Sequence, residues 1–162
     1  LTRAVVPHMI KKRAGKIVNI SSISGILPTP FAGAYCSTKA AVTAYSYSLR
    51  MELAPFGIQV ITVQPGGIQS SLSDNADKNL ERFKNTPYGP IQDAIVERAH
   101  ASQINATPAE VFANKLVDKL AREKTPDFIR LGKDSTLLPL IAKLPIAITD
   151  ALLSKRFGLN RL

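Results

Sequence analysis

The sequence predicts an α/β fold in which helices cover a parallel sheet. Helix-like and strand-like segments alternate over residues 2–63, which is the order expected of such a sheet. The two strand-like segments, 16–21 and 58–63, are short runs rich in Ile and Val, typical of strands buried on both faces. A length of 162 residues suits one hydrophobic core. We therefore expect residues 1–162 to form a single domain or a large piece of one.

The composition is that of a globular protein, and it indicates no metal site. Hydrophobic residues make up 45% of the chain and charged residues 20%, so the chain can form a core. The single cysteine, Cys36, cannot form an internal disulfide, which suits a reducing compartment such as the cytoplasm. His8 and His100 have no Cys, Asp or Glu clustered near them at the spacing that zinc or calcium requires. We expect a cytoplasmic protein without a bound metal.

The net charge of +9 favours an anionic partner, but it does not choose among nucleic acid, anionic lipid and an anionic cofactor. The densest basic run, Lys11-Lys12-Arg13, lies at the end of a predicted helix, where cations offset the helix dipole. No aromatic residue interrupts this run to stack on a base. We therefore expect no nucleic-acid partner.

The first expected elements are a helix, a strand and a loop. Apolar residues at positions 5, 6, 9 and 10 have helical spacing and predict a helix over residues 2–12. Ala14-Gly15 is a helix stop, and the β-branched run 16–21 then predicts a strand. The segment 22–33 is rich in Ser, Gly and Pro, so we expect a loop there.

A second helix and a second strand follow. An apolar stripe at helical spacing predicts a helix over residues 34–53, ended by a Pro and a Gly. The strand at 58–63 stops at Pro65-Gly66-Gly67, which indicates a tight turn. In an open α/β sheet, ligands bind beyond the carboxyl ends of the strands. Ser21-Ser22 and Pro65-Gly66 both lie at such ends.

Residues 70–108 are polar and irregular, with room for one or two short helices. A connection this long usually acts as a lid or a binding segment, so we expect 70–108 to cover a substrate site. Thr107 as a cap and Glu110 three residues later predict the start of a helix that extends to about residue 124.

The C-terminal part is expected to add a last strand at 127–131 and an apolar, basic tail at 136–162. Two prolines, Lys143 and Asp150 interrupt the apolar stretch of the tail, which makes it a poor membrane-spanning helix. We expect the tail to be a docked helix or an interfacial one that contacts a membrane surface.

Tyr35 and Lys39 raise a question of chemistry, because residues four apart on a helix lie on one face. An ammonium next to a phenol favours the phenolate form, which would suit proton transfer. The spacing alone leaves two interpretations open. The pair is either an acid–base unit or two surface residues of an ordinary helix.

Three segments carry a family resemblance: GKIVNISSISG (15–25), AYCSTKAAV (34–42) and LRMELAPFGIQVITVQPGGI (49–68). Together they resemble the catalytic half of the short-chain dehydrogenase/reductase family. The resemblance implies a Rossmann-like doubly wound parallel sheet, of which this chain is the C-terminal part. It also implies an oxidoreductase that interconverts an alcohol and a carbonyl compound.

The resemblance assigns roles to three side chains. In the family, a Tyr is the general acid/base, and this position is Tyr35. A Lys four residues later stabilises the phenolate and binds the nicotinamide ribose, and this position is Lys39. A Ser thirteen residues before the Tyr holds the substrate oxygen, which corresponds to Ser22.

The same resemblance implies a nicotinamide cofactor, NAD or NADP. The positions that match the family's cofactor-binding residues are Tyr35, Lys39, Pro65, Gly66, Ile68 and Ser70, the last where the family usually has Thr. The chain contains no G-x-G-x-x-G phosphate-binding turn, nor the residue that would choose between NAD and NADP. We therefore expect the chain to lack the cofactor-binding N-terminal half and to be inactive on its own.

Substrate and partners follow from weaker similarities. The tail is similar to those of hydroxysteroid- and retinol-dehydrogenase-like members, which implies a lipophilic small-molecule alcohol or carbonyl substrate. The small residues of helix 34–53 would allow homo-oligomerisation through that helix, as in the family, or close packing on its own sheet. The alternative to an enzyme is a non-catalytic interaction module, held to a partner or to a membrane surface by the tail.

Overall fold

The sheet lies at the centre of the fold, as the alternation of segments predicts. A computed structural model of the protein describes residues 2–71, 80–81 and 83–162. In these residues the sheet has three parallel strands, in the order β1 (Gly15–Ile20), β2 (Ile58–Pro65) and β3 (Phe128–Leu131). The α/β fold and the last strand are therefore confirmed.

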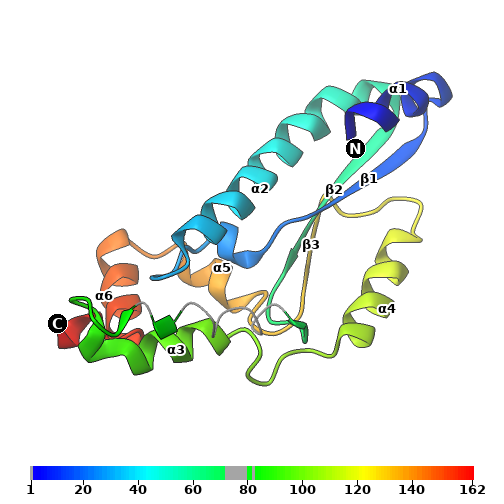
Figure 1. Cartoon of the computed structure of the whole chain (residues 1–162). Helices are drawn as coiled ribbons and strands as arrows, with labels where there is room; N and C mark the ends of the chain where they lie inside the picture. The colour runs from blue at the N-terminus through cyan, green and yellow to red at the C-terminus, as the bar shows by residue number, and fades with distance from the viewer. Residues whose placement is uncertain (1, 72–79, 82) are drawn as a thin grey trace.

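Helices cover both faces of this sheet (Figure 1). α1 (Thr2–Lys12) and α2 (Gly33–Leu53) pack on one face, and α4 (Ala109–Leu120) packs on the other. This arrangement follows from β2, because successive side chains of a strand point to opposite faces of a sheet. Both faces of β2 are apolar over residues 58–63, so both faces need a cover.

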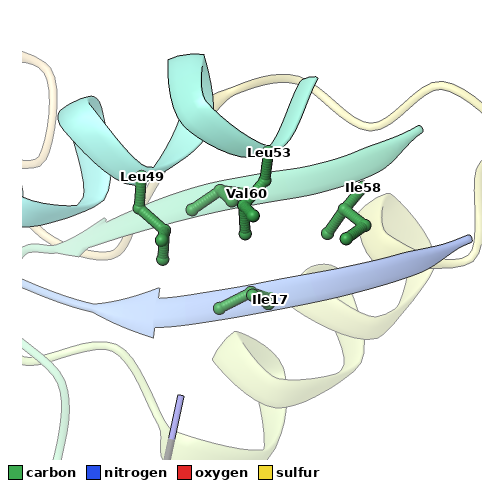
Figure 2. Packing of buried hydrophobic residues seen from close by; sticks show 5 residues of the cluster. All are labelled: Ile17, Leu49, Leu53, Ile58 and Val60. Carbon is green, nitrogen blue, oxygen red and sulfur yellow. The ribbon is translucent and has the colours of Figure 1, made fainter. Parts of the chain in front are cut away.

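The first core cluster fills the face under α1 and α2. Ile58 and Val60 of β2 meet Leu49 and Leu53 of α2, and Ile17 of β1 closes the cluster (Figure 2). All five side chains are buried. Burial of an aliphatic side chain of this size contributes about 1.5–3 kcal/mol each, so this cluster holds α2 against the sheet.

The second core cluster lies on the opposite face, under α4. Its buried members are Ile61, Val63 and Ile129. Lys16 of β1 points to the same face, and its Nζ donates to the backbone carbonyls of Leu120 at 2.8 Å and Arg122 at 2.6 Å. The last carbonyls of a helix lack partners within the helix, and a cation there also offsets the helix dipole. Lys16 therefore fixes the end of α4 to the sheet.

Two details of α4 differ from the expectation. The residue that caps it is Pro108, without a side-chain cap, so the predicted role of Thr107 is wrong. The backbone N–H of Thr107 instead donates to Gly67 O at 3.0 Å, and its carbonyl accepts from Gln69 N at 2.9 Å. Pairing with the segment after β2 thus holds Thr107. The helix ends at Leu120, four residues earlier than expected.

The remaining helices gather at one end of the molecule, near the beginning of α2 (Figure 1). They are α3 (Gln92–His100), α5 (Leu137–Ile141) and α6 (Ile146–Arg156). The structure also contains the 3-10 turns η1 (Ile23–Gly25), η2 (Ala54–Phe56), η5 (Gly89–Ile91) and η6 (Leu159–Arg161). α3 belongs to the predicted lid segment, and α5 and α6 belong to the predicted tail.

Ion pairs join the end of the tail to α3. Arg156 pairs with Glu97 at 2.7 Å, and Arg161 pairs with Asp93 at 2.9 Å. Hydrogen bonds from the two guanidinium groups lower the pKa of both carboxyls. The tail is therefore docked on the lid segment. Among the described residues, no helix has the length and apolar character needed to span a membrane.

Candidate active site

A pocket of about 830 Å³ opens at the carboxyl ends of β1 and β2. Its walls come from η1, the first turns of α2, the segment after β2, α3, and the helices of the tail. All seven site residues expected from the sequence line it: Ser22, Tyr35, Lys39, Pro65, Gly66, Ile68 and Ser70. The fold thus brings together residues from two strand ends and one helix.

Ser22 and Ser21 use their hydroxyl groups differently. Ser22 caps η1, and its Oγ accepts a hydrogen bond from Ser24 N at 3.1 Å. Within the described residues, the Ser22 hydroxyl hydrogen has no acceptor, so it can donate to a ligand. Ser21 Oγ instead donates to Lys39 O at 2.7 Å and lies 2.7 Å from Thr43 Oγ1. Ser21 therefore fastens β1 to α2, and Ser22 presents a donor to the pocket.

Tyr35 and Lys39 share one face of α2, as their spacing predicts. Lys39 Nζ lies 5.7 Å from the centroid of the Tyr35 ring and donates to Ile20 O, at the end of β1, at 3.2 Å. The carbonyl holds the ammonium between the strand end and the phenol. Tyr35 is 37% exposed, so a molecule in the pocket can reach it. The arrangement provides a proton donor with a cation beside it.

The segment after β2 is held by the loop after β3. Gly66 N donates to Leu131 O and Gly67 N donates to Lys133 O, both at 2.9 Å. A Cβ atom on Gly66 would overlap the carbonyl oxygen of Lys133. Close packing against the protein's own backbone therefore requires glycine at this position.

Gln103 supports the same segment, and no local pattern in the sequence indicated it. Its Nε2 donates to Ile68 O at 3.1 Å, and its Oε1 accepts from Ser70 N at 3.0 Å. The Ile68 N–H donates to no backbone carbonyl in the described part of the chain. Gln103 thus fixes the segment. In this position the Ile68 N–H has no backbone acceptor among the described residues.

Asn19 lies on β1 close to these residues but has a structural role. Its Nδ2 donates to Ser46 Oγ of α2 at 2.9 Å. The one cysteine of the chain, Cys36, is buried and forms no disulfide. Among the described residues, no three His, Cys, Asp or Glu side chains gather as metal ligands would.

A comparison with known protein families shows the family to which the chain belongs. A profile of the short-chain dehydrogenase family matches residues 1–81, which is half of the chain. The chain belongs to this family. The match spans every site residue expected from the sequence, from Ser22 to Ser70, and it ends before α3. The residues matched by the family profile therefore form the strand ends of the pocket. Residues after position 81 form the rest of its walls.

Three proteins show what this short-chain dehydrogenase chain is similar to. The 3-ketodihydrosphingosine reductase of Bacteroides thetaiotaomicron is 47% identical over 123 residues, covering 71% of this chain and 46% of that protein. The NADPH-dependent 1-acyldihydroxyacetone phosphate reductase of Schizosaccharomyces pombe is 32% identical over 129 residues, covering 78% and 40%. A solved short-chain dehydrogenase from Streptomyces avermitilis superimposes with a TM-score of 0.67 at 28% identity, covering 99% and 57%. The chain thus spans about half the length of the proteins it matches.

Proposed function

We propose that the chain supplies the catalytic residues of an NAD(P)-dependent oxidoreductase that interconverts a lipophilic alcohol and its ketone or aldehyde. The observation that carries this proposal is that Ser22, Tyr35 and Lys39 line one pocket, with the Ser22 hydroxyl hydrogen unused among the described residues and the Lys39 ammonium 5.7 Å from the centroid of the Tyr35 ring. This set contains a hydrogen-bond donor, an acid and a cation, which are the groups that carbonyl reduction needs from a protein.

Each of the three side chains has one task in the proposed reduction. The Ser22 hydroxyl donates a hydrogen bond to the substrate oxygen and holds it near Tyr35. The Tyr35 hydroxyl gives its proton to that oxygen as negative charge develops there, and the Lys39 ammonium stabilises the phenolate that remains. In oxidation the phenolate takes the proton back. The nicotinamide supplies or accepts the hydride.

The residues present fit a nicotinamide. Lys39 offers an ammonium for the ribose hydroxyls, and the Ile68 N–H and the Ser70 side chain offer polar groups for the carboxamide. Gln103 holds Ile68 and Ser70 in place. Residues that bind the adenosine end of the cofactor would choose between NAD and NADP. This chain also has no Gly-rich turn for the pyrophosphate.

The walls of the pocket favour an apolar substrate. Leu138 and Ile141 of α5 and Leu152 and Leu153 of α6 line it. Two relatives have names that specify a ketodihydrosphingosine and an acyldihydroxyacetone phosphate. Both names describe ketones, and we propose a ketone or alcohol with a hydrocarbon chain as the substrate here.

A test measures oxidation of NADH and NADPH with a panel of long-chain, steroid, acyl and sugar ketones. We expect turnover by the protein expressed from its complete reading frame. We expect none from the 162-residue chain alone, because the sequence has no phosphate-binding turn. Tyr35→Phe should lower turnover about 10²- to 10⁴-fold, the usual contribution of a general acid. Tyr45→Phe on the same helix is the matched control, because Tyr45 is exposed and does not line the pocket.

Three outcomes would contradict the proposal. Equal turnover of the Tyr35→Phe and Tyr45→Phe proteins would remove Tyr35 from the mechanism. A strong preference for sugar ketones would remove the lipophilic substrate. Ketone reduction by the isolated chain would show that it needs no further nucleotide-binding segment.

One observation favours a second candidate function, a cytoplasmic module that contacts a membrane surface or a second copy of the chain. Apolar side chains of the tail are exposed, and we call them the tail surface: Leu137, Leu140, Leu144, Ile146 and Ile148. Tyr45, Tyr47 and Met51 are likewise exposed on α2, where a second copy could pack. This second function is compatible with the first, because neither surface includes Ser22, Tyr35 or Lys39.

A further inference from the structure

The pocket carries more positive charge than the proposed hydride chemistry uses. Among the described residues that line it, four are cations and one is an acid. The cations are Lys39, Arg98 of α3, Lys133 in the loop after β3, and Arg156 at the end of α6, and the acid is Asp134. Lys39 belongs to the proposed catalytic set, so the other three need an explanation.

Two of these three cations already have partners in the protein. Lys133 Nζ donates to Ile104 O at 2.6 Å. Arg156 Nη2 donates to Glu97 Oε1 at 2.7 Å, and the hydrogen bond raises the pKa of Arg156. Both contacts hold the lid segment to its neighbours. Lys133 and Arg156 therefore have structural roles that require no ligand.

Arg98 differs, because a neutral side chain is its hydrogen-bond partner. Its Nε and Nη2 both donate to Thr29 Oγ1, at 2.9 and 2.6 Å, and its guanidinium lies 5.8 Å from the ring centroid of Phe157. A guanidinium has five N–H groups, and these bonds use two. In the part of the chain that the structure describes, no carboxylate forms an ion pair with Arg98.

This environment is unfavourable to a charge in the free protein. Burial lowers the pKa of Arg98, and the nearby Cys36 thiol and Tyr35 phenol act in the opposite direction. A half-buried guanidinium without an anion has lost part of its hydration and gained little in return. Such a group in a pocket is suited to an anionic ligand, which would restore the lost electrostatic stabilisation.

We infer that Arg98 binds an anionic oxygen group of the substrate, a phosphate ester or a carboxylate. The planar guanidinium matches such a group through two parallel hydrogen bonds. The apolar residues of α5 and α6 line the same pocket and would contact the hydrocarbon chain. The inference rests on the proposed function, and it narrows the substrate to a ketone or alcohol that carries both an apolar chain and an anionic group.

Calorimetric titration of the full chain tests this inference without any turnover. The probes share one alkyl chain: octyl phosphate, nonanoate, octanol and octylamine, each below its aggregation concentration, with inorganic phosphate as a further probe. We expect octyl phosphate or nonanoate to bind at least about tenfold more tightly than octanol, which is the usual effect of hydrogen bonds to a charged group. Octylamine should bind most weakly, because it repeats the charge of Arg98.

Four variants separate a binding role from a structural one. Arg98→Gln should reduce the preference for the anion over octanol to about twofold or less, and Arg98→Lys should keep part of it. Lys155→Gln removes one exposed cation that does not line the pocket and should keep the full preference. Thr29→Val removes the hydrogen-bond acceptor of Arg98 and should also keep a preference for the anion, since the guanidinium remains. Thermal unfolding of each variant reports the structural cost.

The possible results are distinct. Equal affinity of the wild-type chain for all alkyl probes, or a preference that Arg98→Gln leaves intact while its melting temperature falls, would overturn the anion site. Equal losses in Arg98→Gln and Lys155→Gln would attribute the preference to net charge and would also overturn it. Anion preference without turnover of any ketone by the protein from the complete reading frame would contradict the proposed oxidoreductase and leave the anion site supported.

Discussion

The adjacent serines after the end of β1 both line the pocket, but their hydroxyl groups have different hydrogen-bond partners. Ser21 is 2% exposed, and its hydroxyl is bound to Lys39 O and Thr43 Oγ1. Ser22 faces the pocket with its hydrogen available within the described structure. The family resemblance implies that Ser22 is the serine that contacts the substrate. The hydroxyl of Ser21 is occupied by its contacts with α2, which favours Ser22 for that role.

Exchange of each serine for alanine should separate stability from activity. Ser21→Ala removes the hydroxyl that links Lys39 O and Thr43 Oγ1, which keep their own hydrogen bond, so we expect a loss of about 0.5–1.5 kcal/mol in the free energy of unfolding and little change in turnover. Ser22→Ala should cost about 1 kcal/mol or less through its cap and lower turnover about a hundredfold. Urea unfolding and ketone reduction measure the two quantities. The reverse pattern would assign the substrate contact to Ser21.

At the scale of elements, the site depends on how closely η1 approaches α2. Gly25, at the end of η1, lies against the backbone of α2, where an added Cβ would be 2.7 Å from the carbonyl carbon of Lys39. Ser22 caps η1, and Lys39 lies on α2. Their relative positions therefore depend on residue 25 having no side chain. The sequence marks the segment as a loop, and the packing gives the glycine its reason.

Gly25→Ala should push η1 away from α2. We expect a loss of about 1–3 kcal/mol in the free energy of unfolding, as for other overpacked sites, together with a fall in turnover. Gly33→Ala is the matched control, because no atom lies within 4 Å of its added Cβ at the beginning of α2. That control should be neutral or should stabilise the protein by up to about 1 kcal/mol. Equal stability of the two variants would contradict the close contact.

At the scale of the whole molecule, the tail has two sides. One side contributes Leu138, Ile141 and Leu153 to the pocket, and ion pairs to Asp93 and Glu97 hold its end on α3. The other side is the tail surface, on which Ile146 is 78% exposed. If the substrate is lipophilic, as we propose, an apolar surface beside the pocket would let a membrane deliver it, and this would link the two candidate functions.

Vesicle binding tests the tail surface. We expect the chain to sediment with neutral phosphatidylcholine vesicles at high salt, where surface charge is screened. Ile146→Asp should weaken that binding about tenfold, because it removes an aliphatic side chain from the contact. Val117→Asp is the control, since Val117 is 61% exposed on α4. Binding that disappears at high salt, or that both variants weaken equally, would contradict the role of the tail surface.

Much of this architecture could be predicted from local patterns. Helical periodicity located α1 and α2, and short β-branched runs located β1 and β2, all to within about two residues. The cap of α4 was missed, since pairing of Thr107 with the segment after β2 overrides its local preference. Gln103 and Arg98 were also missed, because their partners, Ile68 and Thr29, are far away in the sequence.

The sequence by itself determined the alternation of helices and strands, because each segment carries its own local pattern. It also placed Tyr35 and Lys39 on one face of a helix, because residues four apart are neighbours there. It also carried the family motifs from Ser22 to Ser70. Only the tertiary structure decided which residues complete the pocket. Arg98, Gln103 and the tail reach it through the way helices pack beyond the ends of the sheet, and that packing is a long-range property that no local pattern encodes.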